Sequence, residues 1–365
     1  MADLKPSVLI TGAAGNLGLR LLSQLPDFSV IGTDVARPAT GDLTHFDFIN
    51  LGQEVSCLEM IELLREYQPQ AVVHLAFVID PVRTGVLDVD HMWHINVAGT
   101  ARVVEAIGEA NRSGAQIKKF IYASSVSAYG PELPGEVNEN YPLGGHTLPY
   151  AIHKRESDTV VQNRAAELGD CCTYILRPQI YAGASMENYL VGAFRGTPSG
   201  RGPRAAKMRA AGKRLPVVLP MGRRYLDNAI QFIHVDDIAR LIAWILRRNV
   251  NDGRLTVLNV AGRGESMTFG ECIRLSGNRF IPIPTKFLFN LILRLMWNAG
   301  ISGIPPEASP YMTGAYAMDT ARLREFLGSD YENVIQYTMR AAFEETCQPN
   351  VSRPTLQPSP AQRTA

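Results

Sequence analysis

Cysteine is scarce and irregularly placed in this sequence of 365 residues. There are five cysteines, an odd number, and they form neither a Cys-x-x-Cys nor a His-x-Cys pattern. Disulfide frameworks use even sets of cysteines, and zinc sites use the paired spacings that are missing here. We therefore expect no disulfide framework, no bound metal and a reducing compartment.

Long apolar runs and a leader segment are also missing. The longest apolar stretch, Phe287–Ile301, is interrupted by Asn290, Arg294 and Asn298, so it is too short and too polar to span a bilayer. The chain passes from Met1 almost directly into an apolar strand, without the pattern of a signal peptide. The sequence predicts a cytoplasmic protein with no membrane partner.

Neither sign of charge is in excess over the whole chain. There are 36 Lys and Arg against 35 Asp and Glu, which gives no chain-wide reason to expect a nucleic acid or an anionic membrane as partner. Locally the balance breaks, because Asn188–Leu226, the basic segment, contains nine Lys or Arg and no acid. This segment is either a solvated loop or a contact for a small anionic ligand, since arginine suits a diphosphate.

The order of the apolar residues predicts the fold class. Short β-rich runs alternate with helical patterns over the first 180 residues, which is typical of a parallel sheet covered by helices. Strands are expected at Ser7–Thr11, Phe28–Asp34, Thr44–Phe48, Ala71–Leu75, Phe120–Ser124 and Cys172–Leu176, and helices at Leu17–Gln24, Glu54–Tyr67, Asn96–Ala110 and Tyr150–Leu168. The prediction is an α/β fold with a Rossmann-type, doubly wound parallel sheet, whose ligands bind at the carboxyl ends of the strands.

Beyond residue 183 the alternation loosens. We expect a nucleotide-binding Rossmann domain over residues 1–183 and a smaller, mostly helical substrate lobe over 184–347. Within that lobe, residues 226–262 rejoin the sheet through a helix at Phe232–Arg248 and a strand at Leu255–Val260. The last residues, 348–365, hold four prolines and few large apolar groups, so a disordered tail is expected there.

A glycine-rich turn links the first strand to the first helix. Such a turn lets the backbone approach a pyrophosphate, while the helix N-terminus offers N–H groups to it. Taken alone, the pattern could also be a merely tight turn. The residues expected to contact the cofactor there are Gly12, Gly15, Asn16, Leu17 and Gly18.

An acidic residue closes the next strand. Asp34 lies 22 residues after Gly12, a spacing at which a carboxylate can hold both ribose hydroxyls and repel a 2′-phosphate. We therefore expect NAD, with NADP less favoured. Arg37 keeps the alternative open, because a basic residue there could accept the phosphate.

Tyr150 and Lys154 are four residues apart, so they project from one face of a helix. A phenol has a pKa near 10, about three units above neutral pH, and positive charge from Lys154 and an oxidised nicotinamide ring could lower it. Tyr150 could then exchange a proton with a substrate hydroxyl that Ser125 orients. A pair at this spacing taken alone is more often a surface pair.

In combination these motifs resemble the extended short-chain dehydrogenase/reductases, specifically the NAD-dependent epimerase/dehydratase group. The likeness rests on Thr-Gly-x-x-Gly-x-x-Gly at 11–18, the strand-end serines 124–125 and Tyr-x-x-x-Lys at 150–154. It implies Ser125, Tyr150 and Lys154 as catalytic residues, with Tyr150 and Lys154 also touching NAD. It also implies that the cofactor site includes Asp47, Phe48, Ala76, Asn96 and Pro178. A homodimer through Asn96–Ala110 and Tyr150–Leu168 is implied by resemblance only.

Departures from the family pattern reduce the number of reactions that the chain is expected to catalyse. Sugar-nucleotide dehydratases carry an acidic pair directly after the active-site hydroxyl residue, whereas this chain has Val126 and Ser127. No cysteine falls near Ser125, so a reductive epimerase with a cysteine–histidine pair is not supported either. Simple hydride chemistry remains, with or without re-reduction on the other face of the substrate.

Three hypotheses for the function stay open, and two of them differ in the substrate. A nucleotide sugar or related polyol is favoured by Asn188 and Arg223, expected diphosphate contacts, although Ile230 and Gln231 replace an Arg-Asp pair common in such enzymes. An apolar alcohol or ketone, as in 3β-hydroxysteroid dehydrogenases or flavonoid reductases, would fit if Phe287–Trp297 lined a pocket rather than formed a core helix. The third hypothesis is a protein that senses NAD without turnover.

Overall fold

The computed structural model describes residues 5–79, 88–249 and 252–348 of the chain. The expected tail therefore lies outside the described residues, except for Gln348.

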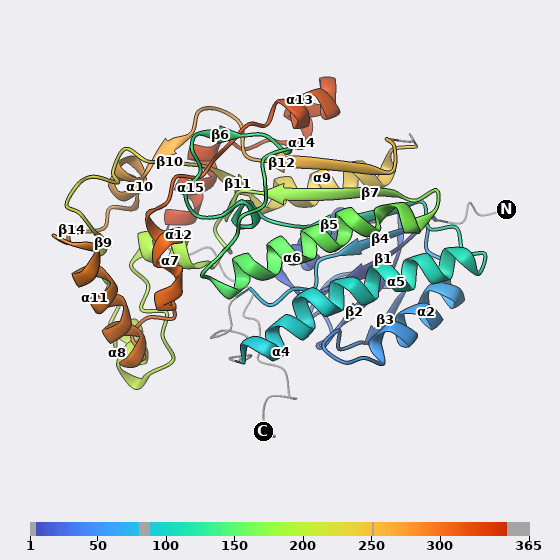
Figure 1. The fold of residues 1–365 in the computed structure, drawn as a ribbon, viewed down its shortest axis with the longest axis horizontal. Coiled ribbons are helices and arrows are strands. Elements are labelled where there is room, and N and C mark those ends of the chain that lie inside the picture. Colours follow the sequence, from blue (N-terminus) through green and yellow to red (C-terminus); the bar gives the residue numbers. More distant parts are fainter. Residues whose placement is uncertain (1–4, 80–87, 250–251, 349–365) are drawn as a thin grey trace.

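A seven-stranded, all-parallel sheet forms the centre of the larger half (Figure 1). Its strands lie in the order β12-β7-β5-β4-β1-β2-β3. Their bounds are β1 Ser7–Thr11, β2 Ser29–Asp34, β3 His45–Phe48, β4 Ala71–His74, β5 Lys119–Ala123, β7 Cys172–Pro178 and β12 Leu255–Val260. The order turns back between β1 and β4, which makes the sheet doubly wound and confirms the predicted fold class. The carboxyl ends of β1 and β4 at this switch point are where such sheets bind ligands.

Helices cover both faces of the sheet. On one face lie α1 (Asn16–Ser23) and α9 (Val235–Arg247), and on the other lie α2 (Ser56–Tyr67), α5 (Gly99–Arg112) and α6 (Pro149–Arg164). Side chains alternate between the faces along each strand, as the pleat requires. In β1, Val8 and Ile10 join the core under α1 and α9, whereas Leu9 joins the core under α2 and α5.

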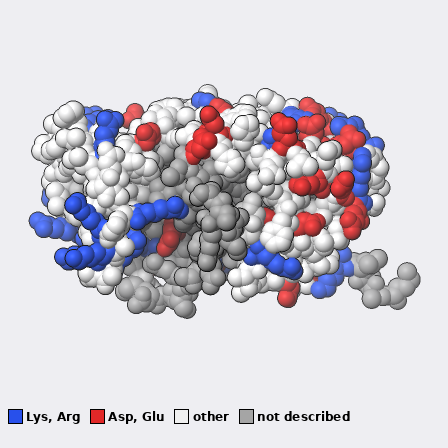
Figure 2. Space-filling model, turned by 90° about the horizontal axis from the view of Figure 1, so that it is seen from below, with Lys and Arg blue, Asp and Glu red and all other residues white. Residues whose placement is uncertain are grey.

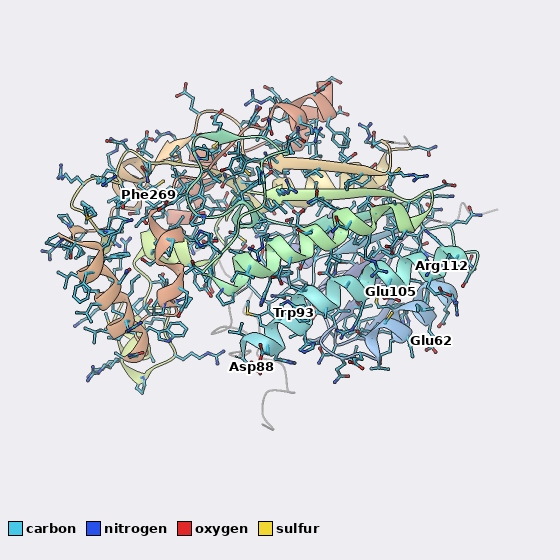
Figure 3. The ribbon with its side chains drawn as sticks, viewed as in Figure 1. Glu62, Asp88, Trp93, Glu105, Arg112 and Phe269 are labelled. Carbon is cyan, nitrogen blue, oxygen red and sulfur yellow. The ribbon has the colours of Figure 1, made fainter. Side chains whose placement is uncertain are left out.

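The smaller half is a mostly helical lobe, drawn at the left of Figure 1. Its helices are α7 Tyr189–Arg195, α8 Pro203–Ala210, α10 Phe269–Ser276, α11 Lys286–Asn298, α12 Ser309–Thr313 and α15 Met339–Cys347. Short strand pairs complete it: β9 Val217–Leu219 with β14 Phe280–Pro282, β10 Ala229–Ile230 with β13 Met267–Thr268, and β6 Glu136–Val137 with β15 Ala317–Met318. Phe269 lies in its core with Phe194 and Phe343 (Figure 3). Helices α13 Ala321–Leu327 and α14 Tyr331–Val334 return to the sheet side.

Two predicted helices begin differently from the expectation. The segment expected as Asn96–Ala110 is preceded by α4 (Val89–Trp93) and passes through a π-helical turn, His94–Ala98, before α5 begins. The segment expected as a helix from Phe232 begins instead as strand β11, Phe232–His234, which pairs with β8, Ile180–Ala182. All three β11 residues are buried, and the His234 side chain then caps α9 by accepting the N–H of Asp236.

The basic segment is not a loop throughout. It contains α7, α8 and β9, and Figure 2 shows basic side chains gathered at the end of the molecule that carries α8 and α11. The expectation that Phe287–Trp297 forms a core helix is wrong for one side of that helix. In α11 only Phe289 and Leu293 are buried, whereas Phe287 is 78% exposed. Apolar content alone did not reveal that the lobe covers a single side of α11.

Candidate active site

The glycine turn packs closely against the end of β4. Gly12 has φ +74°, and its N–H donates to Thr33 O at 2.8 Å. A Cβ at Gly12 would lie 2.5 Å from the Ala76 nitrogen, and a Cβ at Gly18 would lie 2.5 Å from Gly12 O. Only glycine fits at both positions. The glycine-rich turn expected from the sequence is therefore present, and it packs directly against Ala76. The cofactor contacts expected of these residues stay predictions.

The turn opens directly into the N-terminus of α1. Gly15 is the N-cap and offers no side-chain cap, and the first turn holds no acidic residue. The N–H groups of Asn16, Leu17 and Gly18 begin the helix, and such first N–H groups have no acceptor within a helix. A backbone free of Cβ atoms beside a helix N-terminus fits the pyrophosphate of a dinucleotide.

Asp34 stands at the end of β2 next to this turn. Its carboxylate accepts the N–H of Ala14 at 2.9 Å and of Val35 at 2.7 Å. Burial raises the pKa of Asp34, and these backbone hydrogen bonds oppose the rise. Each oxygen retains acceptor capacity for a ribose hydroxyl. Arg37 is exposed and lies over the Phe46 ring, at 5.6 Å from its centroid.

The expected adenine contacts lie on the neighbouring edge strand β3. Asp47 accepts a hydrogen bond from His45 Nε2 at 2.9 Å, so part of its carboxylate is engaged within the strand. The Phe48 ring is 66% exposed and meets Phe46 edge to face. An exposed aromatic ring at this strand end is consistent with a base-stacking surface, and that role stays a prediction for both residues.

Lys154 lies inside the protein one helical turn after Tyr150 on α6. Its side chain is almost fully buried, and Nζ donates to Ala123 O, at the end of β5, at 2.6 Å. The Phe77 ring centroid is 3.5 Å from the same ammonium group. Burial lowers the pKa of Lys154 to about 7. The Phe77 ring also meets Tyr150 edge to face at 5.9 Å, so one aromatic ring contacts both residues of the pair.

Ser125 joins the same cluster from the carboxyl end of β5. It is buried, and its hydroxyl accepts the N–H of Ser127 at 3.1 Å. Burial raises the pKa of Tyr150 to about 12, and the Ser125 side chain opposes this rise. The protein groups by themselves thus move the pKa of this phenol up, whereas Lys154 and oxidised nicotinamide together were expected to lower it. Positive charge from oxidised nicotinamide would be needed to lower it.

A buried polar network supports the cluster from behind, and sequence reasoning missed it. The Asp158 carboxylate, one turn after Lys154, accepts hydrogen bonds from Ser124 Oγ at 2.5 Å and from two Arg177 nitrogens at 2.9 Å each. Arg177 also donates to the Tyr129 hydroxyl, which donates to Asn259. The spacing of Tyr150, Lys154 and Asp158 along α6 was the available signal. The partner of Asp158, Arg177, comes from strand β7, and no local sequence pattern shows that these two residues meet.

Asn96 and two histidines take structural positions. Asn96 is buried, and its side-chain amide makes two hydrogen bonds to the Val78 backbone. It accepts the Val78 N–H at 2.7 Å and donates to the Val78 carbonyl at 3.0 Å. His74 lies between the Thr11 and Thr100 hydroxyls, and burial lowers its pKa to about 3, so it is neutral. His153 contacts Asn96 at 3.3 Å. These contacts agree with a structural interpretation of both histidines.

The expected substrate contacts Asn188 and Arg223 lie on the lobe side, and the expected cofactor contact Pro178 ends a strand of the sheet. Asn188 caps α7, because its Oδ1 accepts the Val191 N–H at 3.0 Å and its Nδ2 donates to Tyr181 O at 2.8 Å. Arg223 is exposed on the turn after β9. Pro178 is buried at the end of β7. The contacts of all three residues lie outside the Ser125 cluster, so their roles stay predictions.

Gln231 explains one departure from the family pattern. It donates to Ser266 Oγ and Met318 O, and it accepts both the Met318 N–H and the Gln179 side-chain amide. Its neighbour Ile230 is buried in the lobe core. The two positions that hold an Arg-Asp pair in related enzymes therefore serve here to join β10 and β11 to the lobe.

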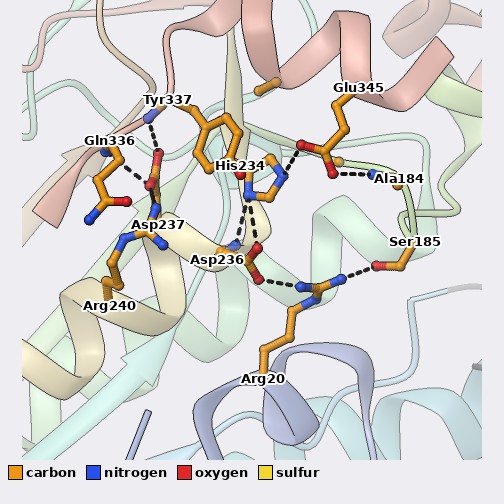
Figure 4. Close-up of polar contacts among 12 residues, drawn as sticks. Arg20, Ala184, Ser185, His234, Asp236, Asp237, Arg240, Gln336, Tyr337 and Glu345 are labelled. Carbon is orange, nitrogen blue, oxygen red and sulfur yellow. Dashed lines mark hydrogen bonds and ion pairs between the residues drawn. The ribbon is translucent and has the colours of Figure 1, made fainter. Parts of the chain in front are cut away.

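A second polar network ties the cofactor side to the lobe (Figure 4). Arg20, on α1, contacts Asp236 and donates to Ser185 Oγ, and Asp236 in turn contacts His234. On the other side of the ring, His234 Nε2 is 3.2 Å from Glu345 of α15, whose carboxylate also accepts the Ala184 N–H. The segment 184–185 is thereby held between the first helix and the last described one.

Two kinds of feature are absent from the described residues. Across residues 5–79, 88–249 and 252–348, there is no group of three or more His, Cys, Asp or Glu that could hold a metal ion. Within those same ranges, no helix has the length and apolar character to cross a membrane.

One contact joins α4 to the helix that carries Tyr150 and Lys154. Trp93 of α4 donates a hydrogen bond to the Glu156 carboxylate of α6, which holds α4 against α6 (Figure 3).

The fold and these residues define a class: a Rossmann-type protein with a dinucleotide-binding turn beside a Ser–Tyr–Lys cluster. Residues 8–261 match the NAD dependent epimerase/dehydratase family, and the chain belongs to it. This confirms the enzyme family expected from the sequence, together with NAD as the cofactor after which the family is named.

Curated relatives of this chain include both epimerases and dehydratases. A mouse dTDP-D-glucose 4,6-dehydratase is 28% identical over 178 residues, covering 43% of this chain and 45% of the relative. A UDP-glucose 4-epimerase of Erwinia amylovora is 27% identical, covering 47% of this chain and 52% of the relative. The matched region thus spans about half the length of these relatives. A Bacillus subtilis UDP-glucose 4-epimerase is 24% identical over 73% of this chain and 80% of its own length.

Solved structures resemble the whole fold. MoeE5 in complex with UDP-glucuronic acid and NAD superimposes with a TM-score of 0.60 at 20% identity, covering 93% of this chain and 96% of that one. The UDP-glucose 4-epimerase of Bifidobacterium longum in complex with NAD+ and UDP has a TM-score of 0.62 at 17% identity, covering 93% and 97%. At these identities the likeness establishes the fold.

Proposed function

We propose that this chain is an NAD-dependent oxidoreductase or epimerase that acts on a nucleotide sugar or related polyol. The observation that carries the proposal is the meeting of Ser125, Tyr150 and Lys154 at the carboxyl end of β5, close to the switch point of the sheet. The lobe of residues 184–347 would hold the substrate, and residues 1–183 the cofactor. Relatives named as UDP-glucose 4-epimerases, and neighbours bound to UDP-sugars and NAD, support this choice.

In this proposal Tyr150 moves the proton. Bound NAD+ supplies a hydride acceptor and a positive ring. Tyr150 takes the substrate hydroxyl proton as the hydride leaves carbon, and it returns the proton on re-reduction. Ser125, whose side chain lowers the pKa of the Tyr150 phenol, holds the same substrate oxygen. Lys154, whose pKa of about 7 makes it partly charged at neutral pH, stabilises the phenolate and binds the nicotinamide ribose.

Water elimination is not part of the proposal. A 4,6-dehydratase needs an acid and a base beside the reacting carbons. Directly after Ser125 this chain places Val126, which is buried, and Ser127, whose N–H donates to the Ser125 hydroxyl. Neither side chain can supply that acid or base, so the epimerase side of the family fits better.

The structure gives less support to an apolar alcohol. That hypothesis depended on Phe287–Trp297 lining a pocket, but the large side chains Phe287, Leu291 and Leu295 are exposed on the outside of the lobe. A nucleotide sugar instead has candidate contacts in exposed Arg223 and the N-terminus of α7 beside Asn188.

Replacing Tyr150 by phenylalanine tests the catalytic assignment. Tyr150→Phe removes the proton carrier and keeps the ring that meets Phe77, so NAD binding by calorimetry should be unchanged. Turnover should fall by orders of magnitude, because general acid–base catalysis contributes about 10²–10⁴-fold. Tyr331→Phe is the matched control, since Tyr331 of α14 packs against the core under α1 and α9, on the opposite face of the sheet from α6, and it should keep wild-type turnover.

The assay uses the NAD-loaded protein with separate panels of nucleotide sugars and apolar alcohols. Net oxidation is followed by NADH absorbance, and epimerisation by separating the sugar products. Turnover by Tyr150→Phe equal to wild type would rule out the mechanism. A response confined to apolar alcohols would overturn the substrate class while leaving the mechanism standing.

A further inference from the structure

One helix of the lobe presents large apolar side chains to solvent. On α11, Phe287 is 78% exposed, Leu288 38%, Leu291 40% and Leu295 59%. At about 100° per residue these four positions fall within an arc of about 100° on one side of the helix. The opposite side carries the buried Phe289 and Leu293. The four exposed residues form a continuous stripe, which we call the α11 face.

Basic residues flank both ends of the α11 face. At its C-terminal end, Gly202 N donates to Gly300 O and Gly200 N to Ile301 O, so α8 begins where α11 ends. At its N-terminal end, Gly222 N donates to Ile283 O, which brings the turn after β9 beside the helix. The exposed basic residues of these elements include Arg204, Lys207 and Lys213 on and after α8, Arg224 on the turn, and Lys286 and Arg294 on α11.

Acidic residues are absent from the same surroundings in the sequence. Neither Asn188–Leu226 nor Cys272–Pro306 contains an Asp or Glu. In Figure 2 the basic side chains collect at the α8 and α11 end, while acidic side chains collect at the opposite, sheet end of the face shown. The lobe end is therefore both apolar and positively charged, within a chain whose net charge is near zero.

Contiguous exposed apolar groups bordered by basic side chains are typical of surfaces that lie on anionic bilayers. Apolar side chains enter the boundary between headgroups and acyl chains, and Lys and Arg bind the negatively charged headgroups. We propose that the α11 face and its flanking basic residues bind the surface of a bilayer that contains anionic phospholipid. The contact is peripheral, with α11 lying in the plane of the bilayer. This revises the expectation of no membrane partner, and it is independent of the proposed catalytic function.

Vesicle flotation with the full chain tests the proposal. We expect the protein to float with vesicles of phosphatidylcholine mixed with phosphatidylserine, about tenfold or more better than with phosphatidylcholine alone. Added salt should weaken the binding, since exposed charges are screened. The double variant Leu291→Gln/Leu295→Gln should bind about tenfold or more weakly than wild type, because it removes two apolar groups from the contact. The matched control is Leu58→Gln, an exposed leucine of α2 on the sheet half, which should bind like wild type.

A charge variant tests the same surface without touching its apolar part. Lys207→Gln should weaken binding to the mixed vesicles, whereas Lys118→Gln, an exposed lysine on the sheet half, should not. Unchanged NAD affinity and near-UV circular dichroism would show that the variants are folded.

Two results would overturn the proposal. One is equal flotation of wild type and both α11-face and Lys207 variants. The other is a dimer of wild type, measured by light scattering, that Leu291→Gln/Leu295→Gln converts to monomer while neither kind of vesicle binds the protein. That result would assign the α11 face to a second copy of the chain.

Discussion

The buried Arg177–Asp158 pair should be one of the most sensitive points of this protein. Both side chains are almost completely buried, and two nitrogens of Arg177 lie 2.9 Å from the two Asp158 oxygens. Replacing Arg177 by methionine keeps much of the volume but leaves the Asp158 carboxylate without its cation. Removing one partner of a buried ion pair costs about 3–5 kcal/mol of unfolding free energy.

Chemical denaturation of Arg177→Met, followed by tryptophan fluorescence, measures this loss. The control is Arg112→Met, which breaks an exposed pair with Glu109 on α5 and should cost less than about 1 kcal/mol. The double variant Arg177→Met/Asp158→Leu should be more stable than Arg177→Met alone, because no uncompensated carboxylate remains. If Arg177→Met lost no more stability than Arg112→Met, the reasoning from burial would be refuted.

Two further predictions follow from the site. Burial lowers the pKa of Lys154 from 10.5 to about 7, so the unfolded chain binds more protons than the folded chain between those pH values. The free energy of unfolding should therefore rise with pH over that range, and Lys154→Met should lack this rise in chemical denaturation. An equal slope in both proteins would contradict the prediction. Gly12→Ala combines a positive φ with a Cβ 2.5 Å from the Ala76 nitrogen, and should lose NAD binding by calorimetry. Gly212→Ala, with φ +61° and open space, carries the same kind of backbone strain away from the cofactor and should keep NAD binding.

The sequence predicted most of the sheet because buried strands leave a local signal. Strands β1 and β12 begin and end at the predicted residues, and most of the other elements of the sheet half differ by one or two residues. The glycine turn and the Tyr150–Lys154 pair were also visible, because a turn and a helix fix the spacing of their residues. Ser125 was joined to that pair only through the family resemblance. What these signals share is that each depends on neighbours within a few residues along the chain.

The features that escaped prediction depend on contacts between distant segments. Arg177 reads as an ordinary strand residue until the fold places Asp158 beside it. Gln231 looks like the loss of a charged pair, whereas its amide hydrogen-bonds to residues from three segments that are distant along the chain. The apolar pattern of α11 predicts a helix, but it cannot show which side neighbouring elements leave uncovered.

The network around His234 has a consequence for how the protein is made. Arg20 belongs to the first helix of the chain and Glu345 to the last described one, yet His234 and Asp236 connect them. A ribosome releases the glycine turn long before it releases α15, and domains generally fold as their residues emerge. The nucleotide half can thus begin to fold early, while the outer support of segment 184–185 is completed only when synthesis has passed residue 345.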